Sequence, residues 1–133
     1  TPIRSSAASD VYKRQLPVYG DGKNIRDWLY VEDHVEAIDL ILDKGKIGET
    51  YLIGGDNEKR NIDLVFKLIK ITDSVLGRSE GFSKKLIHFI PDRPGHDYRY
   101  AIDNSKIKEV LGWKPKMPFE LGLDKTIRYY LGL

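Results

Sequence analysis

Residues 16–34 read Leu16-Pro-Val-Tyr-Gly-Asp-Gly-Lys-Asn-Ile-Arg-Asp-Trp-Leu-Tyr-Val-Glu-Asp-His34, and this stretch decides the predicted fold. An extended entry ends at Asp21-Gly22, which predicts a turn because glycine adopts positive φ without strain. The alternation from Ile25 to Val31 predicts a short strand. Glu32 and Asp33 are then predicted to cap a helix. A strand followed at once by a helix points to an α/β fold.

Predicted helices and strands alternate along the rest of the chain. They are a helix after Asp33 with Val35, Ile38, Ile41 and Leu42 on its apolar face, a strand at Thr50–Ile53, a helix capped by Asn61 with Ile62, Val65, Phe66 and Ile69 on its apolar face, a strand at Lys85–Ile90, a helix capped by Asn104 or Ser105, and a helix from Pro118. This alternation predicts an α/β class with short parallel strands. The strands are too few to build a covered parallel sheet, so we expect part of a larger fold.

Composition narrows the class of protein. The 133 residues include no cysteine, 22 Lys plus Arg and 20 Asp plus Glu, which gives a formal charge of +2. The absence of cysteine excludes disulfides and thiolate zinc sites and favours a cytoplasmic location. Balanced charge argues against nucleic acid as a partner, and no apolar run approaches the roughly 20 residues that span a membrane. The only methionine is Met117, so Thr1 is not a native translation start and we expect a truncated chain.

Residues 1–15 differ from the rest of the chain. They are small and polar, without a sustained period. The run Asp10-Val-Tyr-Lys-Arg-Gln15 resembles the in-frame translation of a transposon-end adapter used in sequencing libraries. We therefore predict that residues 1–15 are an artefactual or disordered leader and that residues 16–133 form a C-terminal substrate-binding domain. A natural flexible N-terminus is the alternative.

Two motif matches in the first stretch fail on structural grounds. Gly20-Asp-Gly22 begins like a dinucleotide fingerprint, but the third glycine is missing and a strand follows. Tyr19 and Lys23 have the spacing of a Tyr-x-x-x-Lys catalytic pair, but the two glycines between them make the required helix improbable. We expect no catalytic, cofactor-binding or metal-binding residue in this chain.

Arginine and a rigid loop point to anion binding. Arg26 and Arg93 each carry a planar fork that matches phosphate oxygens, and two such forks can clamp a diphosphate. Pro94 and Gly95 restrict the loop and allow a ligand to approach its backbone. Asn61 begins a helix, where its amide and backbone N–H groups can face a phosphate or sugar. From composition alone the alternative stays open that both arginines are surface residues or ion-pair partners.

Three sequence motifs together resemble those of a known superfamily. They are the opening stretch Leu16–His34, then Asp92-Arg-Pro-Gly-His-Asp97 with Tyr100-Ala-Ile-Asp103, and finally Leu111-Gly-Trp-Lys-Pro115 with Phe119, Gly122 and Thr126. They resemble the C-terminal half of the extended short-chain dehydrogenase/reductase superfamily, and within it the dTDP-glucose 4,6-dehydratases are most similar. The likeness covers residues 16–133. Leu52 and Tyr98 depart from the pattern, which more often has Asn and Arg there.

The resemblance implies which residues bind substrate. Leu16, Pro17, Val18 and Tyr19 would line the nucleotide end of the pocket, Arg26 and Arg93 would contact the diphosphate or nucleotide, Asn61 would contact the substrate, and His96 would close the pocket in a loop with Asp92, Pro94 and Gly95. The implied reaction turns dTDP-glucose into dTDP-4-keto-6-deoxyglucose. The NAD site and the catalytic residues would lie in a missing N-terminal Rossmann half, so we expect the fragment alone to be inactive and the parent to be a homodimer.

Two alternatives stay open at this point. Another extended short-chain enzyme, such as a GDP-mannose dehydratase, a UDP-sugar decarboxylase or an epimerase, would share the same C-terminal phrases. A stand-alone nucleotide-binding module without chemistry belongs to a different class of protein. Residues upstream of this chain would separate the enzymes, and nucleotide binding by the chain itself would test the module.

Overall fold

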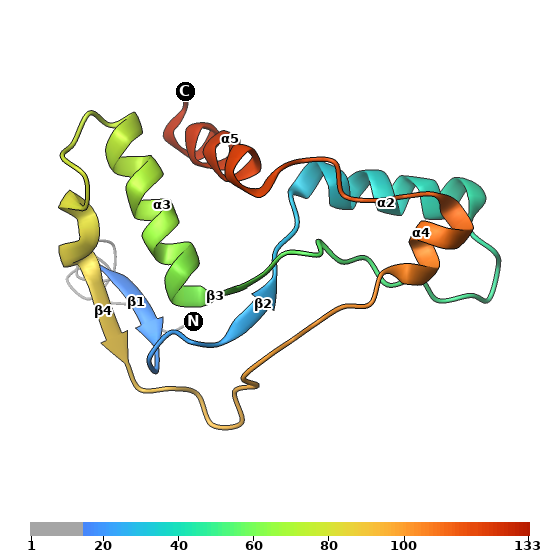
Figure 1. Cartoon of the computed structure of the whole chain (residues 1–133), viewed down its shortest axis with the longest axis horizontal. Helices are drawn as coiled ribbons and strands as arrows, with labels where there is room; N and C mark the ends of the chain where they lie inside the picture. Colours follow the sequence, from blue (N-terminus) through green and yellow to red (C-terminus); the bar gives the residue numbers. More distant parts are fainter. Residues whose placement is uncertain (1–14) are drawn as a thin grey trace, which may run out of the picture. The chain divides into compact units, whose positions relative to one another are not determined.

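The computed structural model describes residues 15–133 (Figure 1). The predicted leader, residues 1–15, lies outside the described residues except for Gln15, and it stays a prediction. The chain divides into two compact units. The first contains Asn61–His96 and the described segment up to Lys23, and the second contains Asn24–Arg60 and Asp97–Leu133. Each unit is described separately below.

The first unit is built on two parallel strands. Strand β1 (Leu16–Tyr19) pairs with β4 (Ile87–Ile90), with Val18 opposite Phe89 and Tyr19 opposite Ile90. Helix α3 (Asn61–Val75) and the 3₁₀ turn η1 (Phe82–Leu86) complete the unit (Figure 1). The predicted parallel pairing is confirmed, and α3 begins at Asn61 itself, one residue earlier than a cap at Asn61 predicts. The predicted strand Lys85–Ile90 begins later, because η1 occupies its first residues.

A glycine turn joins β1 to the rest of its unit. Gly22 has φ +71°, and a Cβ there would lie 2.8 Å from Val18 Cγ1 and 2.9 Å from Ile62 Cβ. The N–H of Gly22 donates to the carbonyl of Tyr19 at 3.0 Å, and the N–H of Ile62 donates to the carbonyl of Gly22 at 2.8 Å. The turn therefore satisfies one of the N–H groups at the start of α3. The turn predicted from Asp21-Gly22 is confirmed.

The second unit holds a two-stranded antiparallel sheet and three helices. Strand β2 (Ile25–Asp27) pairs with β3 (Glu58–Arg60). The helices are α2 (Val31–Lys44), α4 (Ser105–Leu111) and α5 (Phe119–Leu131). Ala37, Ile107 and Trp113 form its buried core, and Leu29, Leu40, Ile41, Tyr51, Ile53 and Leu111 pack around them. The helix predicted from Pro118 is confirmed, with Pro118 at the N-cap.

Residues 50–53 are not a strand in the structure. The predicted strand Thr50–Ile53 has no ladder with any described residue, although Tyr51 and Ile53 pack against the core. The predicted strand from Ile25 to Val31 is also shorter and ends at Asp27. Its partner β3 runs antiparallel, whereas the sequence predicted parallel pairing throughout. Pairing depends on which backbone lies alongside, and spacing within a segment carries no such information.

The predicted cap of α2 is wrong, whereas the predicted cap of α4 is confirmed in position, because Asn104 is its N-cap residue. Helix α2 begins at Val31 with Tyr30 at its N-cap, so Glu32 and Asp33 lie inside the first turn. Asn104 occupies the N-cap of α4 without a capping hydrogen bond from its side chain. Asp103 accepts the Ser105 N–H at 2.9 Å instead, and the Asn104 amide donates to the Gly54 carbonyl at 2.9 Å. The Asn104 side chain therefore has a tertiary partner, whereas Asp103 supplies the local acceptor for Ser105.

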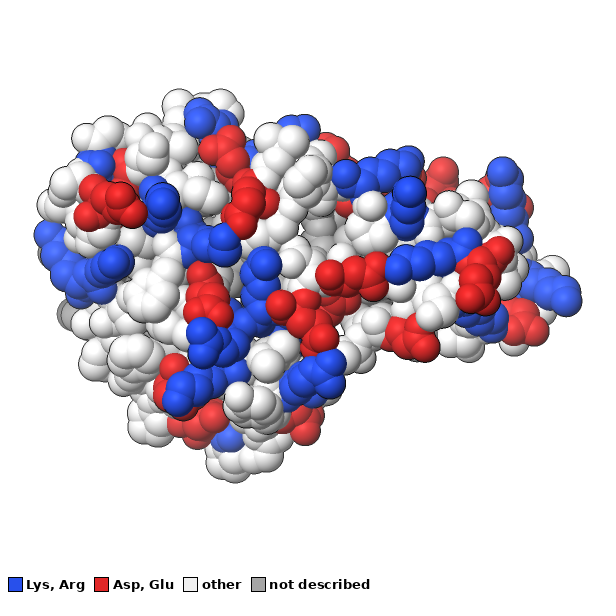
Figure 2. All heavy atoms as spheres, viewed as in Figure 1, with Lys and Arg blue, Asp and Glu red and all other residues white. Residues whose placement is uncertain are grey.

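Charged side chains of both signs cover the surface. In Figure 2, Lys and Arg are interspersed with Asp and Glu on the visible face. The described ion pairs include Arg99 with Glu58, Lys106 with Glu49 and Lys116 with Glu36. Within residues 15–133, no helix is both long enough and apolar enough to cross a bilayer.

Candidate functional site

The loop after β4 carries the candidate site of the first unit. The N–H of Arg93 donates to Asp92 Oδ1 at 2.8 Å, and the N–H of His96 donates to the Arg93 carbonyl at 3.1 Å. Gly95 closes this turn with φ +68°, a conformation that favours glycine. Because β1 and β4 are parallel, Tyr19 and this loop lie at the same carboxyl end of the sheet, the end at which ligands bind in open α/β sheets.

Three side chains of the loop form a hydrogen-bonded series. Arg93 Nη2 lies 3.0 Å from His96 Nε2, and His96 Nδ1 lies 2.6 Å from Asp92 Oδ1. A guanidinium carries only donors, so Nε2 accepts from Arg93. The ring proton therefore lies on Nδ1 and is donated to Asp92. The loop thus places His96 between a cation and an anion.

Tyr19 of β1 completes the group. The Arg93 guanidinium carbon lies 4.9 Å from the centre of the Tyr19 ring, and the rings of Tyr19 and His96 meet edge to face with centroids 6.2 Å apart. A guanidinium over an aromatic face gains a cation–π attraction. We call Tyr19, Asp92, Arg93 and His96 the Arg93 cluster. Four of the residues predicted to bind substrate therefore meet in one place.

The electrostatics of the cluster follow from its hydrogen bonds. The bond from His96 holds the pKa of the Asp92 carboxyl below its ordinary value against the opposing effect of desolvation. The Arg93 N–H and the charges of His96 and Arg93 also lower this pKa. Asp92 is therefore ionised at neutral pH. The His96 side chain is only 11% exposed, whereas that of Asp92 is 44% exposed. Arg93 is exposed, so its guanidinium is accessible to a ligand.

Arg26 lies in the second unit, in strand β2. Its guanidinium donates to the carbonyls of Ile25 at 2.7 Å and Asp97 at 3.1 Å, and it lies 4.4 Å from the centre of the Tyr100 ring. The Asn24 amide donates to the same Asp97 carbonyl at 3.2 Å. Arg26 therefore supports the segment around Asp97 within its own unit. The clamp of Arg26 with Arg93 stays a prediction.

The other predicted residues occupy different settings. Val18 is 1% exposed and packs in the core of the first unit, so only its backbone can face a ligand. Leu16 and Pro17 are exposed on β1, Asn61 begins α3 half-buried, and Pro94 and Gly95 are exposed in the loop. Nothing within 4 Å of Gly95 would meet an added Cβ, so close packing within the chain does not require glycine there. Its positive φ does.

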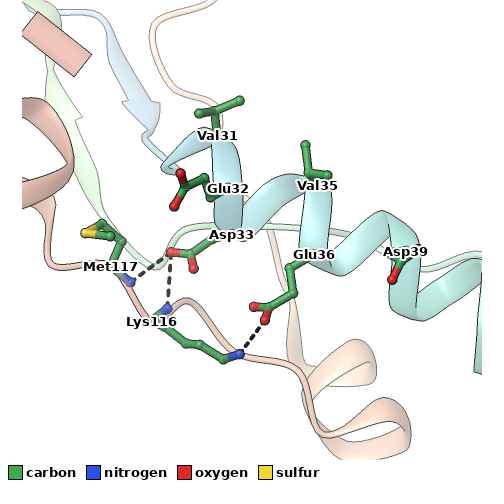
Figure 3. A pocket seen from close by; sticks show the side chains of 8 residues that line it. All are labelled: Val31, Glu32, Asp33, Val35, Glu36, Asp39, Lys116 and Met117. Carbon is green, nitrogen blue, oxygen red and sulfur yellow. Dashed lines mark hydrogen bonds and ion pairs between the residues drawn. The ribbon is translucent and has the colours of Figure 1, made fainter. Parts of the chain in front are cut away.

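Three acidic residues have structural roles that the sequence did not reveal. Asp27 accepts the N–H groups of Gly55 and Asn57, each at 2.7 Å. Asp33 accepts those of Lys116 at 3.1 Å and Met117 at 2.9 Å, at the edge of a pocket beside α2 (Figure 3). Buried Asp73 accepts from the N–H and hydroxyl of Ser83. No local signal distinguishes these carboxylates from solvated ones.

The turn at Gly20–Gly22 does not have the structural context of a dinucleotide fingerprint. The glycine turn at Gly20–Gly22 leads into β2 and not into a helix, so no helix N-terminus follows it to face a pyrophosphate. Tyr19 and Lys23 lie at the end of β1 and in the turn, so they do not share a helical face. Residues 15–133 also contain no group of three or more His, Asp or Glu side chains arranged to hold a metal ion.

Comparison with known proteins supplies the family. The sequence profile of the family described as GDP-mannose 4,6 dehydratase matches residues 3–126. The chain belongs to this family. Within the GDP-mannose 4,6 dehydratase family, its similar relatives include proteins named dTDP-glucose 4,6-dehydratase. One from Escherichia coli is 54% identical over 119 residues, and another from Haemophilus influenzae is 47% identical over 124 residues. The resemblance read from the motifs is confirmed.

The alignments with these relatives cover most of this chain and about a third of theirs. They include 87% of this chain and 33% of the E. coli protein, and 91% of this chain and 37% of the H. influenzae protein. The match lies in the C-terminal part of the dTDP-glucose 4,6-dehydratases, which are NAD-dependent extended short-chain enzymes. The predicted α/β class and superfamily are therefore confirmed.

Solved structures agree with this placement. The dTDP-glucose 4,6-dehydratase of Bacillus anthracis, in complex with NAD, superposes with TM-score 0.76 and 45% identity over 94% of this chain and 37% of that one. The UDP-glucose 4-epimerase of Thermotoga maritima, with UDP-glucose, superposes with TM-score 0.73 and 30% identity over 92% of this chain and 36% of that one. The fold is thus shared by enzymes with different nucleotide-sugars.

Proposed function

We propose that residues 16–133 bind the nucleotide diphosphate-sugar of a dehydratase that converts dTDP-glucose to dTDP-4-keto-6-deoxyglucose. The observation that carries the proposal is the Arg93 cluster, in which an exposed guanidinium is held by His96 and Tyr19 at the carboxyl end of β1 and β4. Arginine matches phosphate oxygens in pairs, so this group suits a diphosphate. The relatives named above support the choice of dTDP-glucose.

The proposal divides the work between two parts of the enzyme. Residues 16–133 bind and orient the substrate, and holding the diphosphate places the hexose for reaction. NAD supplies the redox chemistry of the whole enzyme and is bound outside the described residues. We further propose that the whole enzyme is a cytoplasmic homodimer and that this chain alone has no dehydratase activity. Detectable formation of the 4-keto-6-deoxy product by the 133-residue chain would contradict the last point.

A chimera tests the function. Residues 16–133 replace the matching part of the 51% identical E. coli dehydratase, and formation of the keto product is measured against dTDP-glucose concentration. We expect an active enzyme in which Arg93→Ala and Arg26→Ala raise KM about tenfold or more, since each removes a charged hydrogen-bonding group. Arg128→Ala is the matched control, because Arg128 pairs with Asp124 on α5. Unchanged KM in both site variants would refute the diphosphate clamp.

A second candidate is a related enzyme with another nucleotide-sugar. The family description names GDP-mannose, and the 30% identical epimerase structure contains UDP-glucose. Identity near 50% with the dTDP-glucose enzymes favours dTDP-glucose over both. Calorimetric titration of the chain with dTDP-glucose, GDP-mannose and UDP-glucose separates the three. Tightest binding of GDP-mannose or UDP-glucose would overturn the proposed substrate.

A further inference from the structure

A second pocket lies in the second unit, where the segment between α4 and α5 meets the loop before β3. Its volume is about 450 Å³. Residues 55–57, Lys108 of α4 and residues 114–119 line it, and all of them belong to the second unit. None of these residues is among those proposed above to bind the nucleotide-sugar. The proposed function therefore gives this pocket no role.

Two carboxylates hold the two loops of the pocket in place. Asp27 accepts two N–H groups of residues 55–57, each at 2.7 Å. Asp33 is 5% exposed and accepts the N–H groups of Lys116 at 3.1 Å and Met117 at 2.9 Å. Hydrogen bonds to a carboxylate are stronger than those to a neutral acceptor, so both loops are fixed although neither has regular structure. The pocket is therefore formed before a ligand arrives, as is usual for ligand sites.

Positive charge predominates in the lining. Three lysines, Lys108, Lys114 and Lys116, line the pocket against one carboxylate, that of Asp56. Lys108 pairs with Asp56, and Lys116 pairs at 2.6 Å with Glu36, which does not line the pocket. Lys114 is exposed and has no hydrogen bond or ion pair with the part of the chain that the structure describes. The pocket therefore attracts anions, and Lys114 is its uncommitted cation.

The two paired lysines are also accessible to an anion. The side chains of Lys108 and Asp56 are 37% and 51% exposed, and those of Lys116 and Glu36 are 64% and 49% exposed. Water screens such exposed pairs, so each contributes little to stability. A lysine ammonium has three donors on a flexible stem, so it can keep its carboxylate and also donate to a ligand. A multivalent anion can therefore contact all three lysines.

The rest of the lining is apolar. Pro115, Met117, Pro118 and Phe119 contribute to it. The Lys59 ammonium lies 4.6 Å from the centre of the Phe119 ring, a cation–π contact that brings a fourth positive charge beside the pocket. Methionine is flexible and adapts to a neighbouring group. An apolar surface beside the lysines suits a ligand that carries an apolar group next to its charge.

We propose that this pocket binds a small phosphate monoester that carries a flat apolar group, with Lys114 as its main cation. A phosphate monoester has a second pKa of about 6, so its charge is close to −2 at neutral pH. It therefore gains more from three ammonium groups than a carboxylate with one charge does. The site uses no residue of the Arg93 cluster, so it is an addition to the proposed function.

The experiment uses the only methionine of the chain, Met117, as the reporter. Its methyl group is labelled with ¹³C, and the 133-residue chain is titrated with phenyl phosphate at pH 8 and constant ionic strength. We expect a saturating shift of the Met117 signal. Lys114→Gln should weaken the affinity about tenfold, since a charged hydrogen bond is lost. Lys125→Gln, at an exposed position of α5, is the control and should bind like the wild type.

Several results would overturn the proposal. A Met117 shift that grows linearly without saturation would show that the pocket has no binding site. Equal affinities of the wild type and Lys114→Gln would remove the main cation, and because Lys114 is exposed and unpaired, this substitution is expected to leave the fold unchanged. Loss of the Met117 shift in Arg93→Ala would assign the binding to the Arg93 cluster. We expect Arg93→Ala to titrate like the wild type.

Two further probes test the class of ligand. Benzoate has a similar ring with a single negative charge and is expected to bind about tenfold more weakly than phenyl phosphate. Inorganic phosphate lacks the ring and is expected to bind several-fold more weakly, because the apolar lining then gains no contact. Tighter binding of benzoate would overturn the assignment to phosphate monoesters. Equal binding of inorganic phosphate and phenyl phosphate would overturn the role of the apolar lining.

Discussion

The carboxylate of Asp27 accepts the backbone N–H of Gly55 at 2.7 Å and thereby connects the end of β2 to the loop before β3. The second carboxylate oxygen accepts the N–H of Asn57, also at 2.7 Å. A Cβ on Gly55 would lie 2.2 Å from the Trp28 carbonyl oxygen, so the loop passes directly over the strand end. One carboxylate thus holds a loop without regular structure against the second unit.

Replacing Asp27 should unfold the second unit more easily. Asp27→Ala leaves two N–H groups without their acceptor, and we expect a loss of about 2 kcal/mol in the free energy of unfolding. Urea denaturation followed by tryptophan fluorescence measures this loss. Asp39→Ala is the control, since Asp39 is exposed on α2 and should change stability by less than about 0.5 kcal/mol. Equal effects of the two substitutions would contradict the structural role of Asp27.

Gly22 is required for two reasons that can be separated. It has φ +71°, and a Cβ would meet Val18 and Ile62 below 3 Å. Gly22→Ala should therefore cost about 3 kcal/mol, from backbone strain and steric overlap together. Gly77→Ala is the matched control, with φ +65° and no atom within 4 Å, and should cost only about 1 kcal/mol. Thermal melts of both variants give the comparison. A smaller loss of stability for Gly22→Ala than for Gly77→Ala would contradict the close packing of Gly22 against Val18 and Ile62.

Ile107 should be the most sensitive position of α4. It is fully buried beside Ala37 and Trp113, so Ile107→Ala leaves a cavity and should cost about 2–5 kcal/mol. Val110 lies on the same helix and is 59% exposed. Val110→Ala should therefore change the free energy of unfolding by less than about 0.5 kcal/mol. Chemical denaturation of the two variants tests the core assignment, and similar losses would reject it.

The buried Asp73 should make stability depend on acid. The Ser83 hydroxyl, together with the Ser83 N–H, holds the pKa of the Asp73 carboxyl below its ordinary value. A lowered pKa contributes stability that is present above the ordinary value and is lost as pH falls through the folded value. Ser83→Ala should raise that pKa and make the free energy of unfolding depend less on pH below about pH 4. Ser79→Ala should leave this pH dependence unchanged. The same pH dependence in Ser83→Ala as in the wild type would refute the role of Ser83 in lowering the pKa of Asp73.

The sequence predicted features that depend on neighbouring residues. The turn at Gly22, the start of α3 at Asn61 and the start of α5 after Pro118 follow from backbone preferences within a few residues, and all three are observed. The motifs of residues 16–34 and 92–97 also predicted the superfamily that the comparisons confirm. Four of the residues proposed for substrate meet in the Arg93 cluster.

Only the tertiary structure decided which groups form hydrogen bonds with one another and which segments pair as strands. Asp33 was expected to cap a helix but accepts N–H groups 83 and 84 residues away, and Thr50–Ile53 has the composition of a strand without a ladder in the described residues. The contacts of His96 with Asp92 and Arg93 depend on how the loop folds. Propensity acts along a short stretch of backbone, whereas hydrogen-bond acceptors, strand partners and charge neighbours depend on which distant segments the fold brings into contact.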